Sequence, residues 1–126
     1  MTKQQIFNKI AKFLLAQKKP AYVGYTCKYT IKRKSGDLHC AIGCILPKKI
    51  LDKIEEKDIN GNINELIKHE YIKLPVYFKE NKQFLHELQV AHDMPCGIGK
   101  PWLATWKSNM LEIAKSYKLN TNVFGE

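Results

Sequence analysis

Residues 27–46 read CKYTIKRKSGDLHCAIGCIL, and this stretch decides the fold. Apolar side chains alternate with polar ones toward the end of residues 22–31, and a period of two predicts a half-buried strand. Residues 35–37, Ser-Gly-Asp, predict a turn, and residues 38–40 can return as a second strand. The stretch therefore predicts an antiparallel hairpin with basic side chains around its tip.

The segment that follows the hairpin, Cys40 to Leu46, is expected to form a helix. This helix would place Cys40, Gly43 and Cys44 on one face, three and four residues apart. Glycine lowers helix propensity, so Gly43 indicates either close packing or a ligand at this position.

Helical periodicity surrounds the hairpin on both sides. Thr2 and Gln5 form a capping box that opens a helix ending before Pro20. Pro47 suits the first turn of the next helix, and Asn62 with Glu65 suggests another capping box. Further expected segments are an extended link from Leu74-Pro75, helices over about 81–93 and 102–117, a Pro/Gly-rich loop over 94–101, and a fraying tail over 120–126.

The composition is that of one globular domain spanning residues 1–126. The chain is 44% hydrophobic and 26% charged, too apolar for a disordered protein. We expect an α+β fold in which about five helices pack around one small antiparallel hairpin in a layered core. No apolar run suits a membrane span or a signal peptide, so we expect the protein to stay in the cytoplasm with reduced cysteines.

The positive charge is concentrated near the amino terminus. The net charge is +9, and residues 1–49 carry eleven basic side chains and one acidic side chain, Asp37. If these residues share a face, that face attracts nucleic acid or an acidic protein. The predicted binding residues are Lys28, Lys32, Arg33 and Lys34, with Tyr25 available to stack on a base. Alternatively, since 20 of the 21 basic residues are lysine, the charge serves only to solvate the surface.

Cysteine and histidine residues suggest two kinds of chemical site. In a zinc site, Cys40 and Cys44 would lie one helical turn apart, and the other candidate ligands are Cys27, His92 and Cys96. No Cys-x-x-Cys motif supports this interpretation.

In a nucleophilic site, Cys40 would start a helix whose dipole lowers the pKa of its thiol. His92 would be the base, and Asp93 or Asp37 would orient it. Asp93 lies about 100° around the helix from His92, which makes that pairing difficult.

A third interpretation is purely structural. Free cysteines are usually small buried apolar residues, and His92 would then be a core-edge histidine bonded to a backbone carbonyl. This structural interpretation is the alternative to both chemical sites. We predict no cofactor. A nucleotide-sequestering protein, with bases stacked on the tyrosines near the hairpin, also remains open.

The order of the motifs resembles that of a family of small uncharacterised proteins encoded by bacteriophages and prophages. The shared pattern is Cys27-x-Tyr29, Gly36, the Cys-Ala-Ile-Gly-Cys-Ile block of residues 40–45, and Leu-Gln-x-x-His-Asp over residues 88–93. This chain departs from the family at Thr30, where arginine is usual, and at residues 47–49, where acidic residues are usual. The resemblance implies a phage or mobile-element origin and action inside a bacterial host, but no particular activity.

Together these observations favour a non-enzymatic binding module. Its basic hairpin would engage nucleic acid or an acidic surface of a host protein, with host takeover or counter-defence as the setting. The alternatives that stay open are a Cys/His enzyme or zinc-binding domain and a nucleotide-sequestering protein. The sequence leaves the oligomeric state undetermined.

Overall fold

A computed structural model describes residues 1–23, 26–59, 63–69, 72–95 and 101–125. Within these ranges the chain forms six α-helices and four two-residue strands, and the α+β class is confirmed. The helices are α1 (Lys3–Gln17), α2 (Lys48–Glu56), α3 (Ile63–Lys68), α4 (Val76–Glu80), α5 (Lys82–Asp93) and α6 (Trp102–Tyr117). No described helix has the length and apolar character needed to cross a membrane.

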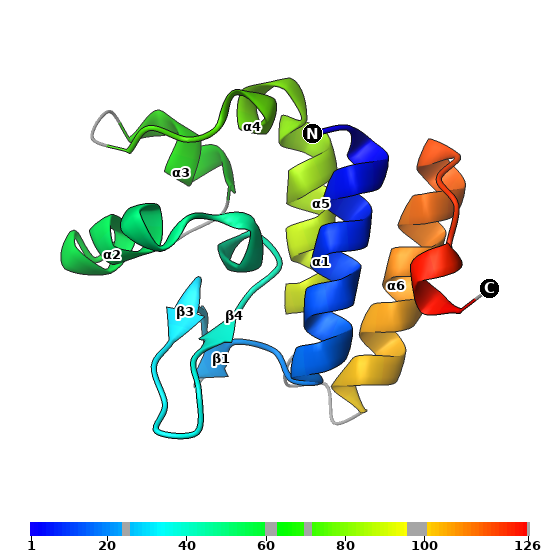
Figure 1. Ribbon diagram of the computed structural model, residues 1–126, viewed down its shortest axis with the longest axis horizontal. Coiled ribbons are helices and arrows are strands. Elements are labelled where there is room, and N and C mark those ends of the chain that lie inside the picture. Colours follow the sequence, from blue (N-terminus) through cyan, green and yellow to red (C-terminus); the bar gives the residue numbers. More distant parts are fainter. Residues whose placement is uncertain (24–25, 60–62, 70–71, 96–100, 126) are drawn as a thin grey trace.

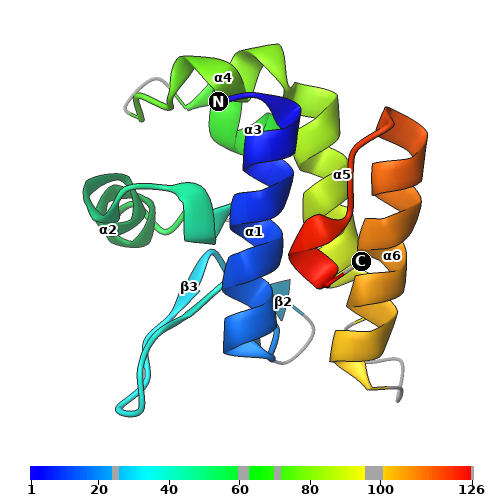
Figure 2. The ribbon, with the colours of Figure 1, turned by 45° about the vertical axis from the view of Figure 1, so that its right-hand side comes forward.

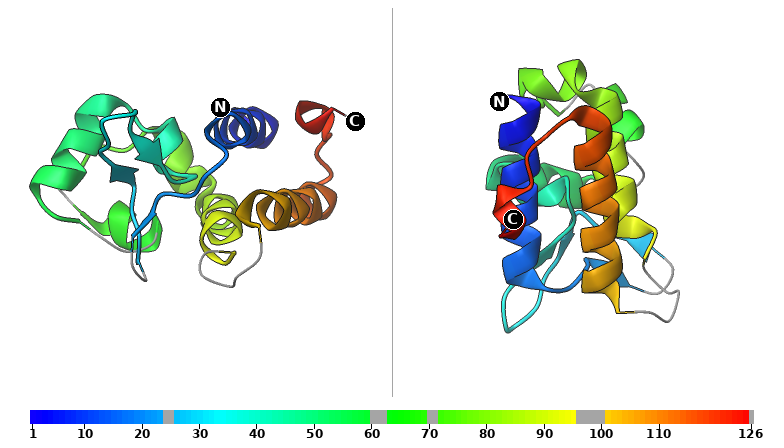
Figure 3. Two further views of the ribbon diagram at one scale, coloured as in Figure 1. Left: turned by 90° about the horizontal axis from the view of Figure 1, so that it is seen from below. Right: turned by 90° about the vertical axis from the view of Figure 1, so that its right-hand side faces the viewer.

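The three long helices, α1, α5 and α6, run side by side, and the strands and α2 to α4 lie on the side away from α6 (Figures 1 and 3). Helix α1 begins at the expected capping box, in which the Thr2 hydroxyl accepts from the Gln5 N–H and the Gln5 side chain accepts from the Thr2 N–H. Five residues of its apolar stripe are fully buried: Ile6, Phe7, Ile10, Ala11 and Leu14. Helices α5 and α6 begin and end within one residue of the predicted positions.

The strands form two separate antiparallel pairs instead of one long hairpin. Strand β1 (Tyr22–Val23) pairs with β2 (Thr26–Cys27), and β3 (Thr30–Ile31) pairs with β4 (Leu38–His39). The predicted turn at Gly36 is correct, and its φ of 120° is one that glycine adopts without strain. The strand expected over residues 22–31 is divided. The β1–β2 pairing continues as far as the Lys28 N–H, which donates to the Ala21 carbonyl at 2.8 Å, and the chain then bends at Tyr29 before β3 begins.

The prediction of a helix over Cys40–Leu46 is wrong. Only a 3-10 helix, η1 (Gly43–Ile45), is present, and it ends at Leu46 with ψ of 140°. This ending has a local cause, since Pro47 disfavours helical backbone in the residue before it. The next helix, α2, then begins directly after Pro47, as expected.

Two further predictions fail at short elements. Helix α4 follows Leu74-Pro75 where only an extended link was expected; proline is favoured at helix starts, and the Pro75 carbonyl accepts from the Phe78 N–H. The tail, expected to fray, instead forms the 3-10 helix η2 (Asn122–Phe124), which lies beside α1. Asn62 and its predicted capping box lie outside the described residues.

The tail is held by aromatic packing and by α1. The Phe124 ring meets Phe7 and Trp106 edge-on, with ring centroids 6.0 and 5.7 Å apart. The Gln4 side chain also accepts from the Asn120 N–H at 2.9 Å. These contacts bring the carboxyl end of the chain against the first helix.

Candidate functional site

The two motifs that suggested chemistry, residues 40–45 and 88–93, meet in the interior. Gln89 of α5 is 7% exposed, and its side-chain oxygen accepts from the Ile42 N–H at 3.1 Å. Its amide nitrogen donates to Asp93 Oδ1 at 2.8 Å. Sequence reasoning did not single out Gln89, although a glutamine between Leu88 and His92 on an otherwise apolar stripe is a detectable signal of a buried hydrogen-bonding role.

His92 has no exposed surface and belongs to the same network. Its Nε2 accepts from the Ala21 N–H at 3.1 Å, so the proton of the neutral ring is on Nδ1, which donates to Asp93 Oδ1 at 2.7 Å. The expectation that Asp93 could hardly orient this imidazole is therefore wrong. The expected backbone partner is also different, because the ring accepts from an amide instead of donating to a carbonyl. Trp102 donates to the His92 carbonyl at 2.8 Å.

Cys40 is 1% exposed, and its surroundings raise the pKa of its thiol, whereas an activated thiol has a lowered pKa. The pKa of Cys40 is raised to about 12, mainly by burial and in smaller part by the nearby Asp93 charge. Hydrogen bonds to the sulfur, including the Gly43 N–H at 3.2 Å, only partly offset these effects. The expected lowering of this pKa by a helix dipole is wrong because no α-helix starts at Cys40. A buried thiol that stays protonated near neutral pH is a poor nucleophile.

The backbone of Gly43 lies so close to Tyr29 that no residue larger than glycine fits at this position. A Cβ atom built on Gly43 would lie 2.1 Å from the Tyr29 carbonyl oxygen. The same carbonyl accepts from the Cys40 N–H at 3.3 Å. Of the two meanings that the sequence allowed for this glycine, the structure therefore supports close packing.

The remaining candidate metal ligands do not form a site in the described residues. Cys44 is partly buried, its thiol donates to the Ala41 carbonyl at 3.1 Å, and burial raises its pKa. No three His, Cys, Asp or Glu side chains gather in a metal-binding group within the described ranges. The Cys27 side chain and all of Cys96 lie outside them, as does Tyr25.

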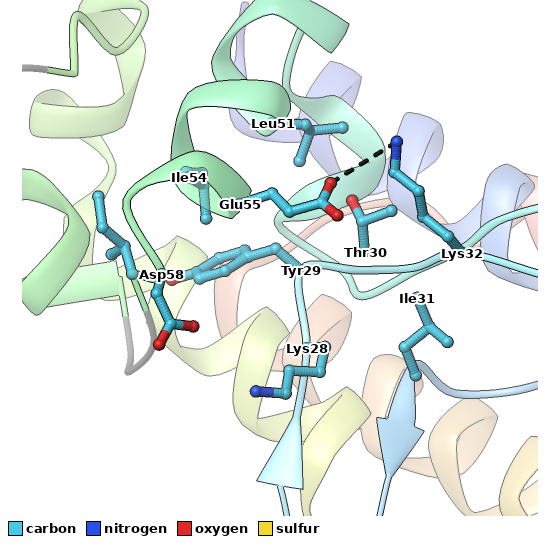
Figure 4. A pocket seen from close by; sticks show the side chains of 10 residues that line it. Lys28, Tyr29, Thr30, Ile31, Lys32, Leu51, Ile54, Glu55 and Asp58 are labelled. Atoms are coloured by element: carbon cyan, nitrogen blue, oxygen red, sulfur yellow. Dashed lines mark ion pairs between the residues drawn. The ribbon is translucent and has the colours of Figure 1, made fainter.

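The basic residues of the hairpin lie mainly in the loop between β3 and β4. Residues 32–37 are all exposed, and the loop projects away from the helices (Figure 2). On one side the loop faces α2, where Lys32 pairs with Glu55 at 3.6 Å, with both side chains 57% exposed. A hollow of about 330 Å³, the hairpin–α2 hollow, opens here (Figure 4). Lys28 and Lys32 line it with Glu55 and Asp58, so its charges are balanced.

On the other side the loop meets the carboxyl end of α1. A hollow of about 540 Å³, the α1–hairpin hollow, lies between them. Its charged lining residues are Lys19, Arg33 and Asp37, and its apolar lining residues include Phe13 and Leu38. Within the described part of the chain, neither Lys19 nor Arg33 forms an ion pair. The excess positive charge near the loop is therefore on the α1 side.

Gln17 fixes the geometry of this second hollow. Its side-chain nitrogen donates to the His39 carbonyl at 2.9 Å, and its oxygen accepts from the His39 N–H at 2.9 Å. The Phe13 ring also packs against the His39 ring, with centroids 5.7 Å apart. Helix α1 thus holds the base of the hairpin, while the loop beyond it stays exposed. Nothing in the sequence distinguished Gln17 from other polar helix residues.

Comparisons with protein-family models, with curated proteins and with solved structures find no match for this chain. The functional inference therefore depends on the residues and their arrangement alone.

Proposed function

We propose that the protein is a non-enzymatic module that binds a polyanion through the β3–β4 loop and the carboxyl end of α1. The observation that carries the proposal is the α1–hairpin hollow, where Lys19 and Arg33 come from different elements and no described carboxylate pairs with either. Lys18 and Lys34 are exposed beside them in the sequence and add to the local field. Asp37 also lines this hollow, so two positive side chains stand against one negative side chain. The remaining positive charge attracts phosphates or clustered carboxylates over a distance of about a Debye length.

The geometry favours a set of binding residues that differs in part from the one expected from the sequence, and Tyr25 of that earlier set lies outside the described residues. Lys32 has a carboxylate partner, and Lys28 lines a hollow that also contains Glu55 and Asp58. These two lysines therefore contribute less net attraction than Arg33 and Lys34. The proposed binding set is Lys18, Lys19, Arg33 and Lys34.

The enzymatic alternative is weaker on physical grounds. Both nitrogens of the His92 ring already have hydrogen-bond partners in the protein, and Cys40 is buried with a raised pKa. A general base needs a nitrogen that can reach a substrate proton. In this arrangement the ring and the thiol connect segments of the chain to each other.

We also propose a biological setting for the module, which follows from the motif pattern only. A protein of phage or mobile-element type that binds a polyanion can occupy a host nucleic acid or the acidic surface of a host protein. Takeover or counter-defence is the role that this setting suggests.

Salt-dependent binding tests the proposal. Fluorescence anisotropy would measure affinity for single-stranded DNA, duplex DNA and polyglutamate between about 20 and 200 mM salt. The double charge reversal R33E/K34E should lower the affinity and reduce the slope of log K against log salt by about 2, since each phosphate contact contributes about 1.

The matched control is K79E/K115E, which makes the same change in net charge on α4 and α6, away from the loop (Figure 1). This variant should bind nearly as well as the wild type. Absence of binding to all three polyanions at low salt, or equal losses in the two variants, would contradict the proposed function.

A further inference from the structure

The α1–hairpin hollow is lined by both charged and apolar side chains, and this combination limits the class of ligand. Lys19 and Arg33 provide positive charge, while Phe13, Ala16 and Leu38 provide apolar surface. A hollow lined only by lysine and arginine would suit a phosphate or carboxylate group alone. Apolar surface next to cations suits a ligand that joins a flat apolar group to an anion.

Asp37 adds a second constraint on the ligand. Asp37 lines the same hollow and makes no ion pair within the described residues. A phosphate placed beside Asp37 would be repelled, whereas a group with N–H donors would be bound. The anionic part of the ligand is therefore expected at Lys19 and Arg33, and a donor-bearing part at Asp37.

A nucleotide with an unstacked base meets these requirements. Every nucleobase has a flat face that can stack on an aromatic ring, and each has N–H donors on its edge. The hollow, about 540 Å³, is within the usual range for small-ligand sites of roughly 300–1,000 Å³. In a duplex the bases are paired and stacked, so only a single strand offers them without a cost.

We infer that the α1–hairpin hollow binds single-stranded nucleic acid, with one base against Phe13 and the flanking phosphates on Arg33 and Lys19. This inference rests on the proposed function and assigns its substrate class. Arg33 contributes charge, and Phe13 contributes stacking surface. Asp37 accepts from the edge of the base and keeps phosphate out of that part of the hollow.

An abasic strand separates stacking from charge. It retains every phosphate of a 12-nucleotide single-stranded DNA but lacks the bases. The wild-type protein should bind the complete strand roughly tenfold more tightly than the abasic strand, and more tightly than a duplex of equal length. The variant Phe13→Leu keeps an apolar side chain and should remove this preference while leaving the salt slope unchanged.

The matched control is Phe124→Leu, because Phe124 is also partly buried but packs against Phe7 and Trp106 instead of lining the hollow. It should keep the preference for the complete strand. Thermal unfolding of both variants would show that binding is measured on folded protein.

The outcomes distinguish the inference from the function on which it rests. Equal wild-type affinity for complete, abasic and duplex DNA would overturn the inference and leave a polyanion-binding module. A preference for polyglutamate over the single strand would overturn it in favour of an acidic protein partner. Loss of all binding would remove the proposed function as well.

Discussion

At the scale of single residues, Gly43 and Cys40 show how tightly the segment after the hairpin is packed. The Tyr29 carbonyl accepts from the Cys40 N–H and lies where a Gly43 side chain would start. Gly43 is not among the described glycines with positive φ, so space, and not backbone conformation, requires glycine here. A packed interior transmits such a constraint because it has few voids.

Gly43→Ala should destabilise the protein by about 1–3 kcal/mol, the usual cost of overpacking a well-filled interior. The free energy of unfolding from urea titration would measure the loss. Gly36→Ala measures the other cost of replacing a glycine, because Gly36 has open space around it but a φ of 120° that strains alanine, and this should cost about 1–3 kcal/mol. Equal stability of Gly43→Ala and the wild type would contradict the close approach.

Cys40 should make stability depend on alkaline pH. Its pKa is raised from 9.0 to about 12 in the folded protein, so the unfolded chain loses this proton first as pH rises. The contribution to stability is complete below about pH 8 and is lost as pH rises from 9 toward 12, because the unfolded state then binds fewer protons. Urea titrations between pH 7 and 10.5 should therefore show a decline that is smaller in Cys40→Ala.

Thiol alkylation gives an independent measure of the same property. Cys40 should react slowly at pH 8 in the folded protein and rapidly in denaturant. Rapid alkylation of Cys40 in the native protein would show that the thiol is activated, and it would restore the enzymatic alternative.

At the scale of elements, α5 holds two other segments of the chain through hydrogen bonds from its side chains. Through Gln89 it binds the Ile42 amide, and through His92 it binds the Ala21 amide, so two segments of the chain attach to one helix. Both side chains also meet at Asp93, which accepts from each of them. Satisfied buried networks of this kind fix one arrangement of the surrounding segments.

His92→Phe should lower the free energy of unfolding by about 2 kcal/mol, since the buried Ala21 N–H would lose its acceptor. Asp93→Asn should cost less, because its side-chain oxygen can still accept from His92 and Gln89. Chemical denaturation of both variants would rank them. A larger loss in Asp93→Asn would show that the charge, not the acceptor, is what matters.

The terminal element η2 should also contribute to stability. Phe124→Ala removes the edge-on contacts with Phe7 and Trp106, and the expected loss is about 2 kcal/mol for a partly buried ring. Asn122→Ala, at an exposed position of the same element, should be nearly neutral. Differential scanning calorimetry would separate the two, and equal melting temperatures would mean that the tail is not docked in solution.

Much of the element order was predictable because helix signals are local. The Thr2 capping box and the helix expected over about residues 81–93 depend on signals within one segment, and both predictions are confirmed. The close approach of Gly43 to the Tyr29 carbonyl and the hydrogen bonds between Gln17 and His39 depend on contacts between segments, which periodicity does not contain. For the same reason Cys40 and His92 could be selected as candidates, but their burial and hydrogen-bond partners could not.

At the scale of the whole molecule, stability should be distributed unevenly. Helix α1 has five buried residues, from Ile6 to Leu14, whereas Ile54 is the only fully buried residue of α2. Helix α2 lies at the periphery, beside the hairpin (Figure 1). Regions with little buried surface open without global unfolding.

Native-state hydrogen exchange should therefore show two classes of amide. Amides of α1 and α5 should exchange with the free energy of global unfolding, and those of α2 with a free energy lower by about 2 kcal/mol or more. A uniform opening free energy across all helices would indicate a single cooperative unit that includes α2.

The paired hydrogen bonds between Gln17 and His39 also affect how copies of the protein meet. The two backbone groups of His39 that Gln17 engages are those an extra strand would need to join β4. Open strand edges are common sites of aggregation, and proteins often cover them. A single glutamine side chain here replaces a neighbouring strand, so the hairpin can remain thin and prominent without recruiting other chains into a growing sheet.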